Sequence, residues 1–73
     1  MNWNRIQDNW GQFRVAAKQR WAKLGESQLL AIGGRRELLA RRIRETYGIS
    51  AQETEDQLVE WQGLLDGMHI RPR

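Results

Sequence analysis

The chain has 73 residues, a net charge of +3 and no cysteine. This length allows one small domain, whose single core must supply nearly all of its stability. Without cysteine the chain can form neither a disulfide nor a thiolate metal cluster, and its longest apolar run, Leu29–Ile32, is far shorter than the ~20 residues of a membrane span.

The first residues lead directly into a charged, amphipathic stretch and lack the apolar h-region of a signal peptide. We therefore expect no secretory leader, no membrane insertion and a cytoplasmic location.

The first predicted helix carries seven apolar residues at steps of three or four. They are Trp3, Ile6, Trp10, Phe13, Ala17, Trp21 and Leu24. At ~100° per residue they fall within an arc of about 80°, which is a narrow apolar stripe on one long helix. Gly11 costs about 1 kcal/mol relative to alanine inside a helix, so we expect a bend or break near residues 9–11. Gly25 is placed as a C-terminal cap.

A short second helix is predicted over Ser27–Ile32, with Leu29, Leu30 and Ile32 as the side chains to be buried. It ends at Gly33-Gly34, because successive glycines permit the left-handed backbone of a tight exit.

The third helix is predicted from about Arg35 to Tyr47, before Gly48. Leu39 and Ile43 recur with Tyr47 at a spacing of four, so they share one helical face.

The fourth helix has a strong start signal, because Ser50-Ala51-Gln52-Glu53 matches a capping box. Its inner face is predicted to hold Ala51, Thr54, Leu58, Trp61 and Leu65. Gly63 and Gly67 weaken its end. The sequence thus predicts an all-α fold, a compact single domain of four short helices over residues 1–66 with the first helix longest, followed by a mobile tail at 67–73.

The predicted core collects the bulky residues of all four inner faces. It comprises Trp3, Ile6, Trp10, Phe13, Trp21, Leu24, Leu29, Ile32, Leu39, Ile43, Tyr47, Leu58 and Trp61.

Several short segments, taken in order, resemble the CsbD-like family across roughly residues 2–62. These segments are Asn2-Trp3-x-x-Ile6-x-x-Asn9-Trp10, Trp21-x-Lys23-Leu24, Gly34-x-Arg36-Glu37-x-Leu39, Tyr47-Gly48-Ile49-Ser50 and Trp61. The resemblance implies a small bacterial cytosolic protein of the general stress response, with four compact helices. It implies no enzymatic activity and no defined ligand. The chain departs from the family at Gly25-Glu26-Ser27-Gln28, where relatives usually have a threonine followed by acids, and this weakens the expected start of the second helix.

The polar residues do not predict an active site. His69 is the only histidine and lies near the end of the chain, whereas Glu53, Asp56 and Glu60 lie opposite the apolar stripe of their helix, where water surrounds them. Gly33-Gly34 lacks the glycine spacing and following Lys-Ser/Thr of a phosphate-binding loop. We therefore expect no enzyme, no catalytic residue, no metal, no cofactor and no small-molecule substrate.

The charge is divided unevenly along the chain. Residues 1–44 hold ten Lys/Arg and three Asp/Glu, a charge of +7, and residues 45–73 hold two and six, a charge of −4. Such asymmetry can mark a nucleic-acid surface, or it can let oppositely charged helices pack together. In so small a chain we favour the packing of oppositely charged helices. The candidate anion or nucleic-acid contacts are Arg35, Arg36, Arg41, Arg42 and Arg44.

The tryptophans also allow two interpretations. Beside basic residues they could lie on a membrane surface, or they could supply the core, since each indole buries roughly 150–250 Å². We favour the core. Two hypotheses of function remain: a non-enzymatic stress protein that engages a protein partner through its surface, and a weak nucleic-acid-binding protein that uses the Arg35–Arg44 helix.

Overall fold

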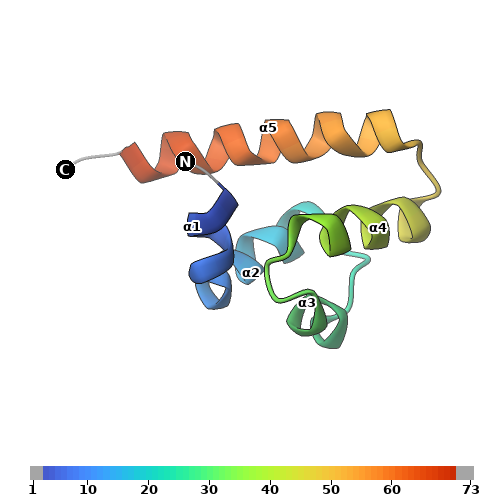
Figure 1. Ribbon diagram of the computed structural model, residues 1–73, viewed down its shortest axis with the longest axis horizontal. Coiled ribbons are helices and arrows are strands. Elements are labelled where there is room, and N and C mark those ends of the chain that lie inside the picture. Colours follow the sequence, from blue (N-terminus) through green and yellow to red (C-terminus); the bar gives the residue numbers. More distant parts are fainter. Residues whose placement is uncertain (1–2, 71–73) are drawn as a thin grey trace.

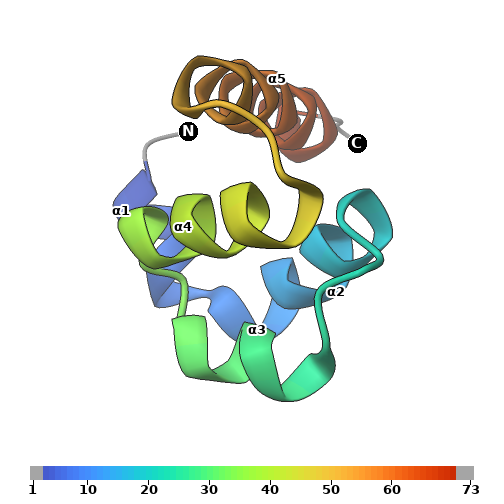
Figure 2. The ribbon, with the colours of Figure 1, turned by 90° about the vertical axis from the view of Figure 1, so that its right-hand side faces the viewer.

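The computed structural model describes the backbone of residues 3–70 and the side chains of residues 3–65. Within that range the chain is helical and contains no strand, which confirms the predicted fold class. The five helices are α1 (Trp3–Asp8), α2 (Trp10–Arg20), α3 (Glu26–Ile32), α4 (Arg36–Tyr47) and α5 (Ala51–Ile70). Helix α5 covers one side of the molecule, α4 lies beneath it, and α3 lies on the far side of α4 (Figures 1 and 2).

The predicted first helix is divided into α1 and α2. The break is centred on Asn9, whose backbone has φ −116° and ψ 34° and whose side-chain amide donates a 2.9 Å hydrogen bond to the carbonyl of Arg5. This confirms a break near residues 9–11, although Gly11 itself lies inside α2.

The prediction that the first helix is the longest was wrong, because α5 is longest with 20 residues. Gly63 was expected to weaken its end. Instead, Gly63 lies on the outer surface of α5, and Trp61 and Leu65 bury their side chains on the inner one and hold this part of the helix against the core. The backbone helix continues through Gly67 to Ile70. Mobility of residues 67–73 stays a prediction, since the side chains of 66–70 and all of 71–73 lie outside the described part.

Helices α3 and α4 begin and end close to their predicted bounds, but α2 ends at Arg20, before the predicted end at Leu24, and Gly25 is the N-cap of α3, not a C-terminal cap of the preceding helix. Helix α3 begins at Glu26, and the Gly25 N–H donates to Gln28 Oε1 at 2.9 Å, which is one half of a capping box. At the start of α5, the Glu53 N–H donates to Ser50 Oγ at 3.0 Å, as the predicted cap requires.

The core agrees closely with the predicted set. Its buried apolar residues are Ile6, Trp10, Ala17, Trp21, Leu24, Leu29, Ile32, Leu39, Ile43, Leu58, Trp61 and Leu65. Trp3, Phe13 and Tyr47, also predicted as core, are half-buried and pack against its margin. Leu30 was predicted to be buried and is 61% exposed, because on the short helix α3 it is one residue away from the face that carries Leu29 and Ile32.

The indole rings join the helices to one another. Trp61 of α5 lies between Trp3 and Trp21, with ring centroids 5.9 and 5.2 Å away. The Trp10 Nε1–H donates to the Leu29 carbonyl at 2.8 Å. Trp10, Trp21 and Trp61 are therefore core residues, as we favoured, and their rings are not displayed for a lipid surface. Over the described residues, no helix has the length and apolar content to cross a membrane.

Candidate functional site

Arg36, the first residue of α4, is held within the fold. Its two terminal nitrogens, Nη1 and Nη2, donate to the two carboxylate oxygens of Glu55 at 2.9 and 2.8 Å, which joins α4 to α5. This hydrogen bonding raises the pKa of the Arg36 guanidinium above its ordinary value and lowers the pKa of the Glu55 carboxyl. The guanidinium also lies 5.8 Å from the centroid of the Trp3 ring. Arg36 is thus largely occupied by intramolecular contacts.

Several other basic residues of the N-terminal portion are also engaged locally. Arg14 pairs with Glu26 at 2.7 Å. The Lys18 ammonium donates to the carbonyls of Ala22 and Leu24 at 3.0 and 2.7 Å, after the end of α2. These contacts use part of the +7 charge within the fold, and Arg36–Glu55 is the kind of helix-to-helix pairing that we favoured.

The remaining predicted contact residues stay at the surface. Arg35, Arg41 and Arg44 are exposed and make no ion pair with a described residue. Arg42 lies 3.7 Å from Glu45 one turn along α4, a long and exposed contact. The structure therefore separates the five predicted arginines into one that is held by Glu55, one that is weakly paired, and three that make no such pair.

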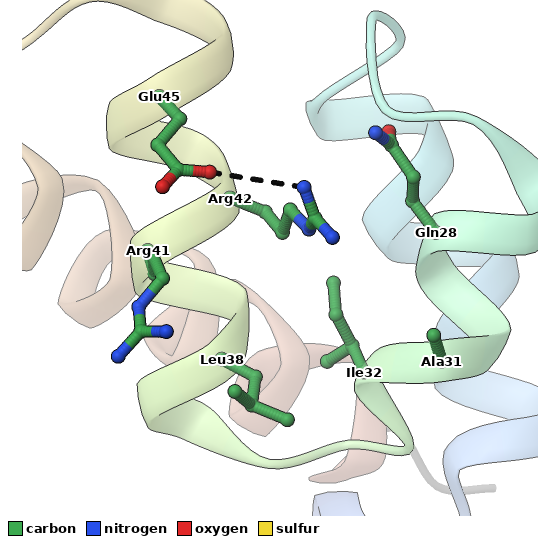
Figure 3. A pocket seen from close by; sticks show the side chains of 7 residues that line it. All are labelled: Gln28, Ala31, Ile32, Leu38, Arg41, Arg42 and Glu45. Atoms are coloured by element: carbon green, nitrogen blue, oxygen red, sulfur yellow. Dashed lines mark ion pairs between the residues drawn. The ribbon is translucent and has the colours of Figure 1, made fainter.

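A hollow of about 260 Å³ lies between α3 and α4, and we call it the α3–α4 hollow. Its lining residues are Gln28, Ala31, Ile32, Leu38, Arg41, Arg42 and Glu45. In Figure 3, Ile32 and Leu38 approach one another from the two helices, Arg42 extends toward α3, and Arg41 lies on the outer side of α4. The hollow therefore combines an apolar floor with a predominantly basic rim.

A second hollow of about 330 Å³ adjoins the first. It shares Arg41 and Glu45 and adds Arg44, Gly48 and Ile49. Together the two hollows bring three of the five predicted arginines, Arg41, Arg42 and Arg44, to one side of α4, with Glu45 between them.

Sequence reasoning missed the α3–α4 hollow. Leu38 is not among the residues of the predicted core, but in the fold it is half-buried against the core margin. Residues 38, 41, 42 and 45 recur at helical spacing, and this signal groups them on one face of α4. No local pattern indicates that α3 packs beside that face.

The carboxylates of α5 lie apart from these arginines. Glu53, Asp56 and Glu60 are exposed, as predicted, and Asp56 accepts a 3.0 Å hydrogen bond from Gln52. In the part of the chain that the structure describes, no group of histidine or acidic residues has the arrangement of a metal site. The His69 side chain lies outside the described residues.

Comparisons with known proteins point to one family. A UPF0337 protein of Pectobacterium atrosepticum is 37% identical over 62 residues, which covers 85% of this chain and 90% of the relative. The UPF0337 protein YjbJ of Escherichia coli K12 is 34% identical over 62 residues, with the same coverage of both chains. A UPF0337 protein of Rhodopseudomonas palustris is 36% identical over 61 residues. No family model and no solved structure matches the chain. The identity extends over almost the whole length of each relative, as the resemblance in residues 2–62 does, and the chain therefore belongs to the UPF0337, or CsbD-like, family.

Proposed function

We propose that this protein is a non-enzymatic general-stress-response protein of the bacterial cytoplasm that acts by binding a macromolecular partner through its folded surface. The stress setting rests on the family resemblance. The observation that supports a surface role is that several residues which carry the family resemblance are engaged in contacts inside the fold. Trp3, Gly34, Arg36 and Trp61 pack and hydrogen-bond within the fold, and they form no concave acid–base site. What remains for function is the exterior.

A crosslinking experiment tests this proposal. A photo-crosslinking residue replaces Arg41, at the rim of the α3–α4 hollow, in the chain expressed in bacteria, and cells are irradiated with and without stress. A matched control places the same residue at Gln12, an exposed position on α2. We expect an adduct from position 41 and none from position 12. The sensitivity of the adduct to protease or nuclease identifies the class of partner. Equal adduct yields at both positions, or none at either, would contradict the proposal.

A second candidate is nucleic-acid binding by the Arg35–Arg44 helix. It is favoured by Arg35, Arg41 and Arg44, which are exposed and have no acidic partner among the described residues. Phosphate contacts release counterions, so binding by three arginines would weaken steeply with salt. It is disfavoured by Glu45, which lies between the arginines in both hollows.

An NMR titration with a DNA or RNA duplex decides this second candidate. Binding predicts amide shifts along residues 35–44 at low salt that fade as salt is added. Arg41→Gln/Arg44→Gln would remove them, whereas Arg14→Gln, away from the hollows, would leave them. A titration without shifts at residues 35–44 eliminates the candidate.

A further inference from the structure

The exposed side of α5 carries acidic residues and two large apolar ones, Val59 and Leu64. Val59 is 62% exposed, and Gln52, Asp56, Glu60 and Gly63 surround it at helical spacing. We call these five residues the α5 outer face. A side chain at Gly63 would meet nothing within 4 Å, so another element can approach the backbone closely there. None of the acids on this face makes an ion pair with a described residue.

The α3–α4 hollow has the complementary character. Ile32 and Leu38 form its apolar floor, Arg42 extends from α4 toward α3, and Arg41, which also lines the hollow, lies on the outer side of α4 (Figure 3). An apolar knob flanked by carboxylates thus exists on one part of the molecule. On another part there is an apolar hollow flanked by two guanidinium groups and one carboxylate, Glu45, which leaves the hollow with a net positive charge. Ion pairs between such surfaces would be exposed, and they would set orientation more than affinity.

The two surfaces cannot meet within one chain. Helix α4 lies between α5 and α3 (Figures 1 and 2). The residues of the α5 outer face are exposed, on the side of the helix opposite to the buried Leu58 and Trp61. Contact between them requires two molecules.

We propose that the protein self-associates head to tail, with the α5 outer face of one copy seated in the α3–α4 hollow of the next. Val59 lies over Leu38, and Asp56 and Glu60 face Arg41 and Arg42. Because the two patches differ, the contact is heterologous and leaves a free patch at each end, so assembly continues beyond a dimer. One helix in a small hollow buries less than a standard interface, so association is weak, and its charged rim makes it sensitive to salt. This inference goes beyond the proposed function and does not depend on it.

Sedimentation velocity on the full chain provides the first test. In low salt we expect the sedimentation coefficient to rise with concentration from about 20 μM to about 1 mM, which spans micromolar to millimolar dissociation constants. At about 0.5 M salt, where the Debye length is only a few ångströms, we expect the monomer at every concentration. A monomer throughout the low-salt series would overturn the proposal.

Two variants, each lacking one patch, provide the sharper test. Arg41→Gln/Arg42→Gln removes the rim of the hollow, and Asp56→Asn/Glu60→Gln removes the acids of the α5 outer face. Alone, each should remain monomeric. Mixed in equal amounts, they keep one intact pair of patches, so we expect a complex of two chains and nothing larger. Their net charges become +1 and +5, so overall charge opposes mixing, and a complex of the two must come from the patches.

A control variant separates the patches from general charge. Asp8→Asn/Glu37→Gln removes two exposed acids outside both patches and should associate like the parent. If instead this control abolishes association, or if the mixed variants stay monomeric, head-to-tail pairing is wrong. The parent chain could also stay monomeric and show NMR amide shifts at Arg41 and Arg42 when a duplex is added. That result would assign the basic rim to nucleic-acid binding and would overturn self-association.

Discussion

Gly34 lies where the turn after α3 touches α1, and its backbone has a φ of +81°. A methyl group there would lie 2.8 Å from the Gln7 Cα and 3.2 Å from the Trp10 Cβ. The carbonyl of Gly34 accepts a 2.7 Å hydrogen bond from the Trp3 indole, so the turn is fixed on both sides. Its neighbour Gly33 has a φ of +60° and open space around it. A side chain at Gly33 would meet backbone strain alone, whereas a side chain at Gly34 would meet both strain and a steric clash, so comparing the two positions distinguishes these effects.

We predict that Gly34→Ala is much more destabilising than Gly33→Ala. Gly33→Ala should cost about 1–2 kcal/mol, the penalty of a left-handed non-glycine residue. Gly34→Ala adds a clash with backbone, which we expect to cost about 1–3 kcal/mol more. Urea unfolding followed by tryptophan fluorescence measures both. Equal losses would mean that α1 is not packed against this turn.

Individual residues show how far the sequence alone was informative. The stripe from Trp3 to Ala17 identified the buried side of α1 and α2, because helical spacing is a local property. Trp21 and Leu24 are also buried, but they lie in the turn that follows α2. The contact that requires glycine at position 34 could not be predicted, because it joins residues 27 positions apart, Gln7 and Gly34. Leu30 was misassigned because the seven residues of α3 are too few for its apolar face to be defined.

At the scale of elements, α5 is attached to α2 through one aromatic contact. Trp21, at the end of α2, is only 1% exposed, packs edge-on against Trp61, and donates its indole N–H to Gln57 Oε1 at 2.9 Å. Among the tryptophans, only Trp21 both packs against another aromatic ring and donates an indole hydrogen bond to a residue of α5.

We expect Trp21→Ala to cost about 3–5 kcal/mol, because it leaves a large cavity between α2 and α5. For a domain of this size that is a large share of the total stability. Trp10→Ala should have a comparable effect, since that ring is also buried and hydrogen-bonded. The matched control is Val15→Ala at a 58% exposed position on α2, which should change stability by less than about 0.5 kcal/mol. Thermal unfolding that left Trp21→Ala equal to the control would contradict the core assignment.

The ion pair between α4 and α5 makes a pH-dependent contribution. The hydrogen bond from Arg36 lowers the pKa of Glu55 in the folded chain below its unfolded value of about 4.3. The stabilisation is therefore complete above that unfolded value and is lost as the pH falls through the folded pKa of Glu55. The side chains are 32% and 47% exposed, so solvent screening limits the gain to about 0.2–1 kcal/mol.

Glu55→Gln tests this contribution. At neutral pH the variant should be less stable than the parent, and the difference should disappear below the folded pKa, where the parent carboxyl is also neutral. Glu60→Gln, at an exposed carboxylate with no ion pair among the described residues, serves as the control. Urea unfolding at several pH values measures both, and a Glu55→Gln deficit that persisted unchanged in acid would exclude the ion pair as its cause.

The elements themselves were largely predictable, because caps and periodicity are encoded locally. Ser50 and Glu53 marked the start of α5, and Gly33 and Gly48 marked the ends of α3 and α4. The length of α5 was not predictable from Gly63 alone, since the burial of Trp61 and Leu65 by other helices outweighs a glycine of about 1 kcal/mol. The α3–α4 hollow required knowledge of which helices are neighbours.

Across the whole molecule, charge has two uses. Some charged residues hold helices together, as Arg36 and Glu55 do, whereas Arg41 and Arg44 project from α4 without an acidic partner among the described residues. Charges of the second kind contribute little to folding, so they are free to determine what the surface binds.

This division predicts that folding and binding can be separated by substitution. Arg41→Gln/Arg42→Gln should change the free energy of unfolding by less than about 0.5 kcal/mol, because both side chains are exposed and the Arg42–Glu45 contact is 3.7 Å long. Arg36→Gln should destabilise the fold more, because it leaves Glu55 without the two hydrogen bonds that join α4 to α5. Unfolding curves for the two variants, recorded beside their sedimentation at low salt, measure both properties. If the rim variant lost stability as Arg36→Gln does, its loss of association could be a consequence of unfolding. If it keeps full stability and loses association, the rim of the hollow is a binding surface and not a part of the scaffold.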